Sequence, residues 1–375
     1  MNILRSCGPN TARRAVLRTG LLLGGSLPLI KLSAIAQAAT IRSVEEFGAV
    51  GDGQRDDWIA ISNALTSADI ISFASGKTYK ISKSLQLGSN KFLVGNGARI
   101  VIRSGLPKMT PVLSLDNCAS VEIQDLIVDG NRDGQVISTS GEQNGGLHCI
   151  RCYAASNVKI RRSVMQNAYA DGLYLGRGCN KVLVEDCTMK SSMRSGCTVT
   201  WGSNIDFVRC QFRDSQGQPP EAGVNIEPNY EREVNSAISF HDCIFTGNAR
   251  RGMKIDLKKR YNRLAGLDVV GCRFFANKSN DGAQMQLSGK DLSLLEMINI
   301  TGNEFDQRLW TGSSSGTTTF RNVTIDKNIF MKGGVSVWNL NRGSQNVVFS
   351  TNRWRKAPTL KSVAFTPTFV GNVMI

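Results

Sequence analysis

A short spacing of apolar residues recurs along most of this chain: apolar, any residue, apolar, two residues, a small or polar residue, any residue, apolar. It occurs nine times, at Val121/Ile123/Leu126/Val128, Val158/Ile160/Ser163/Met165, Val182/Val184/Cys187/Met189, Ile205/Phe207/Cys210/Phe212, Ile238/Phe240/Cys243/Phe245, Leu267/Val269/Cys272/Phe274, Ile298/Ile300/Asn303/Phe305, Val323/Ile325/Asn328/Phe330 and Val347/Phe349/Asn352/Trp354. Successive copies begin 23 to 37 residues apart. Self-similarity at such a period indicates a solenoid of stacked units.

Within each copy, apolar residues two positions apart predict short strands, so each repeat is one β-coil. Stacking the coils places the residues between the two apolar pairs in one internal column, formed by Cys187, Cys210, Cys243, Cys272, Asn303, Asn328 and Asn352. The pattern predicts an all-β, single-stranded, right-handed parallel β-helix. We expect an N-terminal cap and first coils over 39–115, repeats over 116–356, and a C-terminal cap or tail over 357–375.

The first 38 residues have the features of an export signal. Arg13 and Arg14 precede an apolar stretch from Gly20 to Ile30, and the cleavage-site pattern Ala36-Gln37-Ala38 follows it. This order predicts a signal peptide of twin-arginine type, with an ordinary secretory signal as the alternative. We therefore expect a periplasmic or secreted protein that has no membrane partner after cleavage, because the apolar stretch is too short to span a bilayer.

The charge balance is strongly basic. The chain has 45 Lys and Arg against 30 Asp and Glu, a formal net charge of +15, and removing residues 1–38 lowers it to +10. A basic protein favours polyanionic partners. Export, a low aromatic content and the absence of any nucleic-acid-binding motif favour an acidic polysaccharide over nucleic acid. Monomer and homotrimer both remain open.

Nine cysteines follow residue 38, and four of them occupy the inward column. A buried thiol in such a column acts as a small hydrophobe. We expect reduced thiols here rather than disulfides, and we disfavour Cys149 and Cys152 as a redox or metal-binding pair.

The segment 44–65 carries a motif. We expect a strand over 44–47, a Gly-rich turn, and a helix capped by Asp56 or Asp57 with Trp58, Ile61, Ala64 and Leu65 on its apolar face. The residues Phe47, Gly48, Ala49, Gly51, Asp52, Gly53, Asp56 and Asp57 form the pattern FGAxGDGxxDD. This head resembles the opening of the pectate-lyase-like and polygalacturonase-like β-helix superfamily over some 40 residues. We interpret its aspartates as parts of a cap and not as catalytic groups.

Most coils hold a second strand that a glycine opens. Strand alternation predicts two outward columns. The first consists of His148, Tyr174, Thr198, Asn225, Lys254 and Gln284, and the second of Ile150, Gly176, Thr200, Glu227, Asp256 and Gln286. Asn225, Glu227, Lys254 and Asp256 are thereby predicted to form a polar quartet on neighbouring coils, with a plain solvated surface as the alternative.

Loop lengths also indicate a functional site at this polar quartet. The segment from the glycine to the next repeat has 10 and 9 residues after Gly172 and Gly196, but 15, 15 and 16 after Gly223, Gly252 and Gly282. Such insertions predict groove walls, where functional residues gather. As substrate-binding candidates we name, besides Asn225 and His148, residues of these walls or of the strand entrances: Arg194, Arg251, Tyr230, Lys258 and Tyr261. Asp171 and Asp281 are interpreted as turn residues.

Several functions fit this groove. A lyase would need a base, for which Lys254 is a candidate although Asp256 would keep it protonated; Tyr174 or Arg251 could substitute. The resemblance implies Ca²⁺ as a possible cofactor, and Glu227 and Asp256 offer suitable oxygen ligands. A glycosidase would use Glu227 and Asp256 as its acid and base. A C5 epimerase and a non-catalytic polysaccharide-binding or spike-like protein also remain, and the lyase is favoured.

Overall fold

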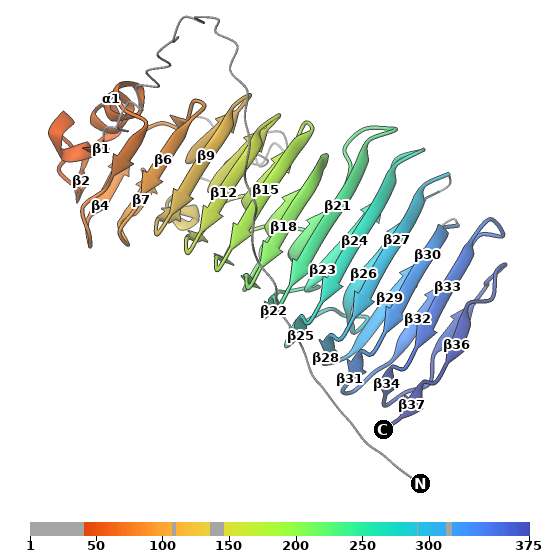
Figure 1. The fold of residues 1–375 in the computed structure, drawn as a ribbon. Coiled ribbons are helices and arrows are strands. Elements are labelled where there is room, and N and C mark those ends of the chain that lie inside the picture. Colours follow the sequence, from red (N-terminus) through yellow and green to blue (C-terminus); the bar gives the residue numbers. More distant parts are fainter. Residues whose placement is uncertain (1–40, 107–109, 136–145, 291, 313–316) are drawn as a thin grey trace, which may run out of the picture. The chain divides into compact units, whose positions relative to one another are not determined.

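The computed structural model describes residues 41–106, 110–135, 146–290, 292–312 and 317–375. Within these residues the chain winds into stacked coils, and their strands form three parallel sheets (Figure 1). The predicted parallel β-helix is confirmed. The predicted signal peptide, 1–38, lies outside the described residues.

The sheets are named A, B and C, and their strands follow in spatial order from the N-terminal end. In the described residues sheet A has 13 strands: β1 (Ile41–Ser43), β3 (Ile70–Ser72), β6 (Lys91–Val94), β9 (Ala119–Gln124), β12 (Ser156–Arg161), β15 (Cys179–Glu185), β18 (Gly202–Val208), β21 (Val234–His241), β24 (Arg263–Val270), β27 (Leu294–Thr301), β30 (Thr319–Asp326), β33 (Gln345–Ser350) and β36 (Thr368–Val370). Sheet B has 13 in the same range: β2 (Asp52–Asp56), β4 (Thr78–Ile81), β7 (Arg99–Ile102), β10 (Ile127–Asp129), β13 (Val164–Gln166), β16 (Thr188–Lys190), β19 (Gln211–Arg213), β22 (Ile244–Thr246), β25 (Arg273–Phe275), β28 (Glu304–Phe305), β31 (Ile329–Phe330), β34 (Arg353–Trp354) and β37 (Val373–Met374). Sheet C has 11 among the described residues: β5 (Leu85–Gln86), β8 (Leu113–Asp116), β11 (Ile150–Tyr153), β14 (Asp171–Gly176), β17 (Ser195–Val199), β20 (Ala222–Ile226), β23 (Met253–Leu257), β26 (Ala283–Gly289), β29 (Arg308–Gly312), β32 (Val335–Trp338) and β35 (Thr359–Lys361).

The repeats stack in the predicted register. Val158 pairs with Val121 on one side and Val182 on the other, and the pairing continues to Val347. The aromatic residues of sheet B stack inside the coil, with ring centroids 4.3 Å apart for Phe245 and Phe274. The core therefore lies inside the coils and runs along the stack.

The inward Cys/Asn column is a hydrogen-bonded ladder at the bend between sheets A and B. The N–H of Cys243 donates to Sγ of Cys272 (3.4 Å), and the N–H of Cys272 donates to Oδ1 of Asn303 (2.8 Å). Each side chain thus satisfies a backbone donor of the preceding coil, which would otherwise be buried without a partner. All nine cysteines among the described residues are free and buried, as the sequence predicts.

The N-terminal cap differs from the prediction at its start. Residues Val44–Phe47 form a 3-10 helix, η1, and not a strand, because Ser43 and Glu46 make a capping box that starts a helical turn. The predicted helix is α1 (Trp58–Ser67), which packs on η1 and β5. Asp57 precedes it, and its carboxylate accepts hydrogen bonds from the N–H groups of Val50 (2.8 Å) and Gly51 (3.0 Å), so it fastens the Gly-rich turn. A second 3-10 turn, η2 (Arg132–Gly134), follows β10.

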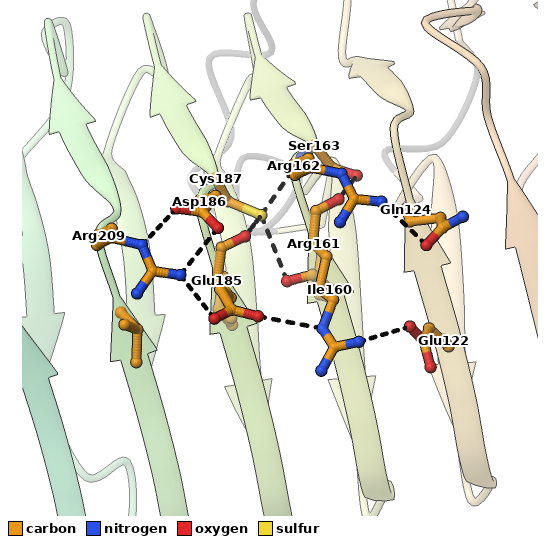
Figure 2. A network of polar contacts seen from close by, with 12 residues as sticks. Glu122, Gln124, Ile160, Arg161, Arg162, Ser163, Glu185, Asp186, Cys187 and Arg209 are labelled. Atoms are coloured by element: carbon orange, nitrogen blue, oxygen red, sulfur yellow. Dashed lines mark hydrogen bonds and ion pairs between the residues drawn. The ribbon is translucent and has the colours of Figure 1, made fainter.

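The outer face of sheet A carries a charge network across neighbouring coils (Figure 2). Arg161 contacts Glu122 and Glu185 at 3.2 Å each, and Arg209 contacts Glu185 and Asp186 at 2.7 Å each. Opposite charges on adjacent strands stabilise the stacking order modestly.

None of the described helices is long and apolar enough to cross a membrane.

Candidate active site

The candidate site lies on the outward face of sheet C. Strand pairing places Arg151, Tyr174, Thr198, Asn225, Lys254, Gln286, Trp310 and Ser336 in one outward column. The predicted alignment is correct from Tyr174 to Lys254 and wrong at both ends. Gln286, not Gln284, lies beside Lys254, because the loop before β26 is two residues longer than the repeat spacing implies.

The prediction for His148 is wrong in the same way. Ile150, predicted to point outward, pairs with the inward Leu173 and is itself buried. His148 therefore precedes the strand, and only 1% of it is exposed. Its ring packs on that of Tyr174, with centroids 4.5 Å apart. Neither a surface position nor direct substrate binding fits this burial.

The predicted quartet does come together. Asn225 Nδ2 donates to Glu227 Oε2 (2.8 Å), and Lys254 Nζ lies 3.0 Å from Asp256 Oδ2. Lys258 joins the two pairs, since its Nζ lies 2.5 Å from Glu227 Oε1 and 3.7 Å from Asp256 Oδ2. Asn225 is fully buried, so it positions Glu227 and has no surface for a substrate.

The lysine keeps Glu227 ionised. Burial acts to raise the pKa of Glu227, but the hydrogen bonds from Lys258 and Asn225 outweigh it, and the pKa lies below its usual value. The same contact raises the pKa of Lys258, although burial opposes that shift. Glu227 and Lys258 therefore form a charged pair at neutral pH.

A pocket of about 470 Å³ opens beside the quartet. Its lining comprises Arg251, Lys254, Asp256, Asp281, Ala283, Gln286, Arg308, Trp310 and Trp338. Arg251 makes a close ion pair with Asp281, and its guanidinium carbon lies 5.8 Å from the centre of the Trp310 ring. Three cations thus face two carboxylates. Such a mixture of aromatic rings and few convergent polar groups is typical of ligand sites.

Asp281 is a turn residue, as predicted, and also a pocket residue. Its Oδ1 accepts hydrogen bonds from Ser279 Oγ (2.5 Å) and from the N–H of Ala283 (3.0 Å). Burial acts to raise its pKa, but these hydrogen bonds and Arg251 outweigh that effect and lower it. Asp281 therefore stays ionised and orients Arg251 over the pocket.

A second polar cluster lies closer to the N-terminal end of sheet C. Asp171, interpreted from sequence as a turn residue, is fully buried at the start of β14, with its Oδ2 3.5 Å from His148 Nδ1 and 3.8 Å from Arg194 Nη1. Burial raises its pKa although Arg194 opposes the shift. Tyr174 belongs to this cluster: burial raises its pKa to about 12, and its hydroxyl accepts a hydrogen bond from Asn229 Nδ2 (3.1 Å).

The remaining wall candidates lie outside the pocket lining. Tyr230 is 73% exposed, and Tyr261 is flanked by Arg232 and Arg260 at 5.5 and 5.4 Å. Their loops adjoin each other, because Asn262 Nδ2 donates to the carbonyl of Tyr230 (2.7 Å). They form a wall next to Lys258 but do not reach the pocket floor.

The residues do not provide a good Ca²⁺ site. Glu227 and Asp256 each have a lysine ammonium group as a neighbour, which occupies the oxygens that a cation would need. In the part of the chain that the structure describes, no three His, Cys, Asp or Glu side chains are grouped so as to hold a metal ion. A Ca²⁺ requirement stays a prediction.

Sequence reasoning missed Arg308, Trp310 and Trp338. They lie on β29 and β32, which the Gly-initiated strand pattern did not reach. Two tryptophans on neighbouring coils beside an arginine were the signal that could have indicated them.

Comparison with known proteins identifies the family. Residues 41–353 match the family model described as rhamnogalacturonase A/epimerase, pectate lyase-like. The pre-neck appendage protein of Bacillus phage B103 is 26% identical over 228 residues, a match that covers 55% of this chain and 26% of the phage protein. The chain thus spans about a quarter of that relative's length.

Solved structures share the fold. The surface adhesin PfbA of Streptococcus pneumoniae has a TM-score of 0.60 at 15% identity, over 89% of this chain and 91% of the adhesin. The A-module of the mannuronan C-5 epimerase AlgE4 from Azotobacter vinelandii has a TM-score of 0.57 at 17% identity, over 90% of this chain and 97% of the module. An adhesin and an epimerase share this architecture, so the fold alone does not specify an activity. The match over 41–353 shows that this chain belongs to the rhamnogalacturonase A/epimerase, pectate lyase-like family.

Proposed function

We propose that this protein is an exported lyase that cleaves an acidic, uronate-containing polysaccharide by β-elimination in the groove on sheet C. The observation that carries the proposal is the pocket, in which the guanidinium group of Arg251 lies beside Lys254 and Arg308 adds a second guanidinium group. β-Elimination next to a uronate carboxylate requires cations that neutralise this carboxylate while negative charge develops. The family match supports a carbohydrate ligand.

A hydrolase is less well supported by the same geometry. An acid–base pair of carboxyl groups needs one member that is protonated at the working pH. The pKa of Glu227 is lowered, and both Glu227 and Asp256 lie beside lysine ammonium groups. Glu227 is therefore ionised, and neither carboxylate lies in the apolar surroundings that a general acid needs.

We assign Lys254 as the base. Tyr174 is outside the pocket lining and its pKa is raised to about 12, which disfavours the phenolate. Arg251 lines the pocket, and burial lowers its pKa against the effect of Asp281. Arginine nevertheless retains its proton in proteins, whereas a lysine amine is a common general base.

Lys254, which is paired with Asp256, first releases its ammonium proton to water. Its amine then takes the proton from C5 of the uronate, and the C–H electron pair becomes the C4=C5 double bond. The C4–O4 bond breaks, and the departing oxygen takes a proton from water. Asp256 then holds the resulting ammonium group in place.

The test is a screen of the mature protein on galacturonate, mannuronate and neutral polysaccharides, with and without Ca²⁺. Absorbance near the wavelength of the conjugated double bond and new reducing ends are read together. Lys254→Met should abolish both signals. Lys327→Met is the matched control, because Lys327 also lies next to an aspartate, 3.4 Å from Asp326, but is 70% exposed and remote from sheet C.

The outcomes separate the alternatives. Both signals rising together, and only with a functional Lys254, would support the lyase. Reducing ends without absorbance would overturn it in favour of a hydrolase with Glu227 and Asp256. Binding without cleavage of any polymer would instead support a non-catalytic polysaccharide-binding protein.

A further inference from the structure

Arg308 differs from the other pocket cations in its partners. Arg251 is paired with Asp281, and Lys254 with Asp256. Arg308 has no carboxylate within ion-pair distance among the residues that the structure describes. Its side chain donates one long hydrogen bond, from Nη1 to Ser336 Oγ (3.4 Å), and its charge contributes to the lowered pKa of Asp281. Asp281 is thus shared between Arg251 and the more distant Arg308, and the guanidinium group of Arg308 is the less tightly paired of the two.

Two indole rings lie next to this charge. Trp310 and Trp338 meet edge to face, with centroids 5.6 Å apart and an interplanar angle of 77°, a geometry that aromatic pairs prefer. Lys361 lies 4.8 Å from the centre of the Trp338 ring and Arg251 5.8 Å from that of Trp310. The rings are thus held from several sides, so they offer a firm apolar surface beside a cation.

The strand order separates Arg308 from the proposed reacting centre. Lys254 is on β23, Arg308 is on β29, and β26 lies between them. Strands in a sheet are about 4.8 Å apart, so these two backbones are roughly 10 Å apart. A sugar unit that contacts Arg308 is therefore a neighbour of the unit that contacts Lys254.

We propose that Arg308, Trp310 and Trp338 form a specificity subsite for one uronate unit adjacent to the reacting unit. The guanidinium of Arg308 binds the carboxylate, for which its planar donors are suited, and a tryptophan supports the apolar face of the sugar ring. The inference rests on the proposed function for the identity of the polymer. In this subsite Arg308 is the residue that distinguishes a charged uronate from an uncharged sugar.

Binding of short sugars tests the subsite without any cleavage. Isothermal titration would compare the galacturonate trimer with its methyl ester, which keeps the rings and removes the charges, on a Lys254→Met background so that the trimer stays intact. We expect the acid to bind at least tenfold more tightly than the ester. Arg308→Gln should lower the affinity for the acid by about tenfold or more and leave that for the ester nearly unchanged.

Two control variants test whether the effect of Arg308→Gln is specific to this subsite. Arg321→Gln removes an exposed arginine from sheet A and should not change either affinity. Trp310→Phe should weaken both ligands alike, since it alters the stacking surface and not the charge. Because Arg308 has only one weak contact, its variant should melt as the wild type does, and the melting curve verifies this.

The results that overturn the subsite differ from those that overturn the lyase. Equal affinity for acid and ester, or an Arg308→Gln variant that binds the acid as well as the wild type, would refute the subsite. Tighter binding of poly(glycerol phosphate) than of the uronate trimer would refute the uronate assignment. Arg308-dependent binding of the acid, with no cleavage of any polymer by the wild type, would support the subsite and refute the lyase.

Discussion

Replacing Asn328 by alanine would interrupt the inward ladder at a fully buried position. Its Oδ1 accepts hydrogen bonds from the N–H and Nδ2 of Asn303, both at 2.9 Å. Its Nδ2 donates to the carbonyl of Ile300 (2.8 Å) and to Asn352 Oδ1 (3.0 Å). The substitution removes all four bonds and gives no replacement.

The expected cost follows from which groups lose their partner. The N–H of Asn303 is left buried without an acceptor, which costs about 1–3 kcal/mol. Asn303 Nδ2 keeps the carbonyl of Val269 and Asn352 Oδ1 keeps the N–H of Asn328, so these groups lose only part of their bonding. With the lost bond to Ile300, we expect a free energy of unfolding lower by about 3–5 kcal/mol.

The assay has a global and a local readout. Urea unfolding gives the change in free energy, and hydrogen exchange of the wild type and variant reports the opening of the coil that holds Asn303. Asn299→Ala on β27 is the matched control, because Asn299 is partly exposed and its side chain accepts a hydrogen bond from Thr301 Oγ1. We expect that control to cost less than about 1 kcal/mol. A cost for Asn328→Ala no larger than that of the control would refute the ladder as a source of stability.

Three further predictions concern sheet C. Lys258→Met should raise the pKa of Glu227, because it removes the hydrogen bond and the positive charge of Lys258 that lower this pKa, while burial still raises it. An unchanged ¹³C titration of Glu227 would contradict this. Asp171→Asn should raise the melting temperature by a few degrees at neutral pH. Because the pKa of Asp171 is higher in the folded than in the unfolded protein, its contribution to stability is complete only below the pKa of the unfolded state. That contribution is lost as the pH rises through the pKa of the folded state. The gain should vanish in acid, and a variant that melts lower than the wild type at pH 7 would count against it. Gly312→Ala should cost about 2 kcal/mol or more, since a Cβ there would lie 1.7 Å from the carbonyl oxygen of Trp338 at a φ of +105°; a melting curve like that of the wild type would disprove this close approach.

The candidate site was predictable only where the repeat spacing is regular. Asn225, Glu227, Lys254 and Asp256 were aligned correctly because β20 and β23 enter their coils at equivalent residues. His148 was misplaced since an insertion precedes its strand, and loop length alone does not determine where a chain re-enters a sheet.

The coil, its register on sheet A and the inward column were predictable from the amino-acid pattern, because they depend on side-chain alternation and on the stacking of equivalent residues. The folded molecule alone shows that Lys258 reaches across to Glu227 from the next coil and that Asp171 is buried beside His148. It also shows that Arg308 lies next to two tryptophans and, among the described residues, has no carboxylate within ion-pair distance. The physical reason is that burial and charge pairing depend on long side chains from different coils, whose contacts no local pattern in the sequence encodes.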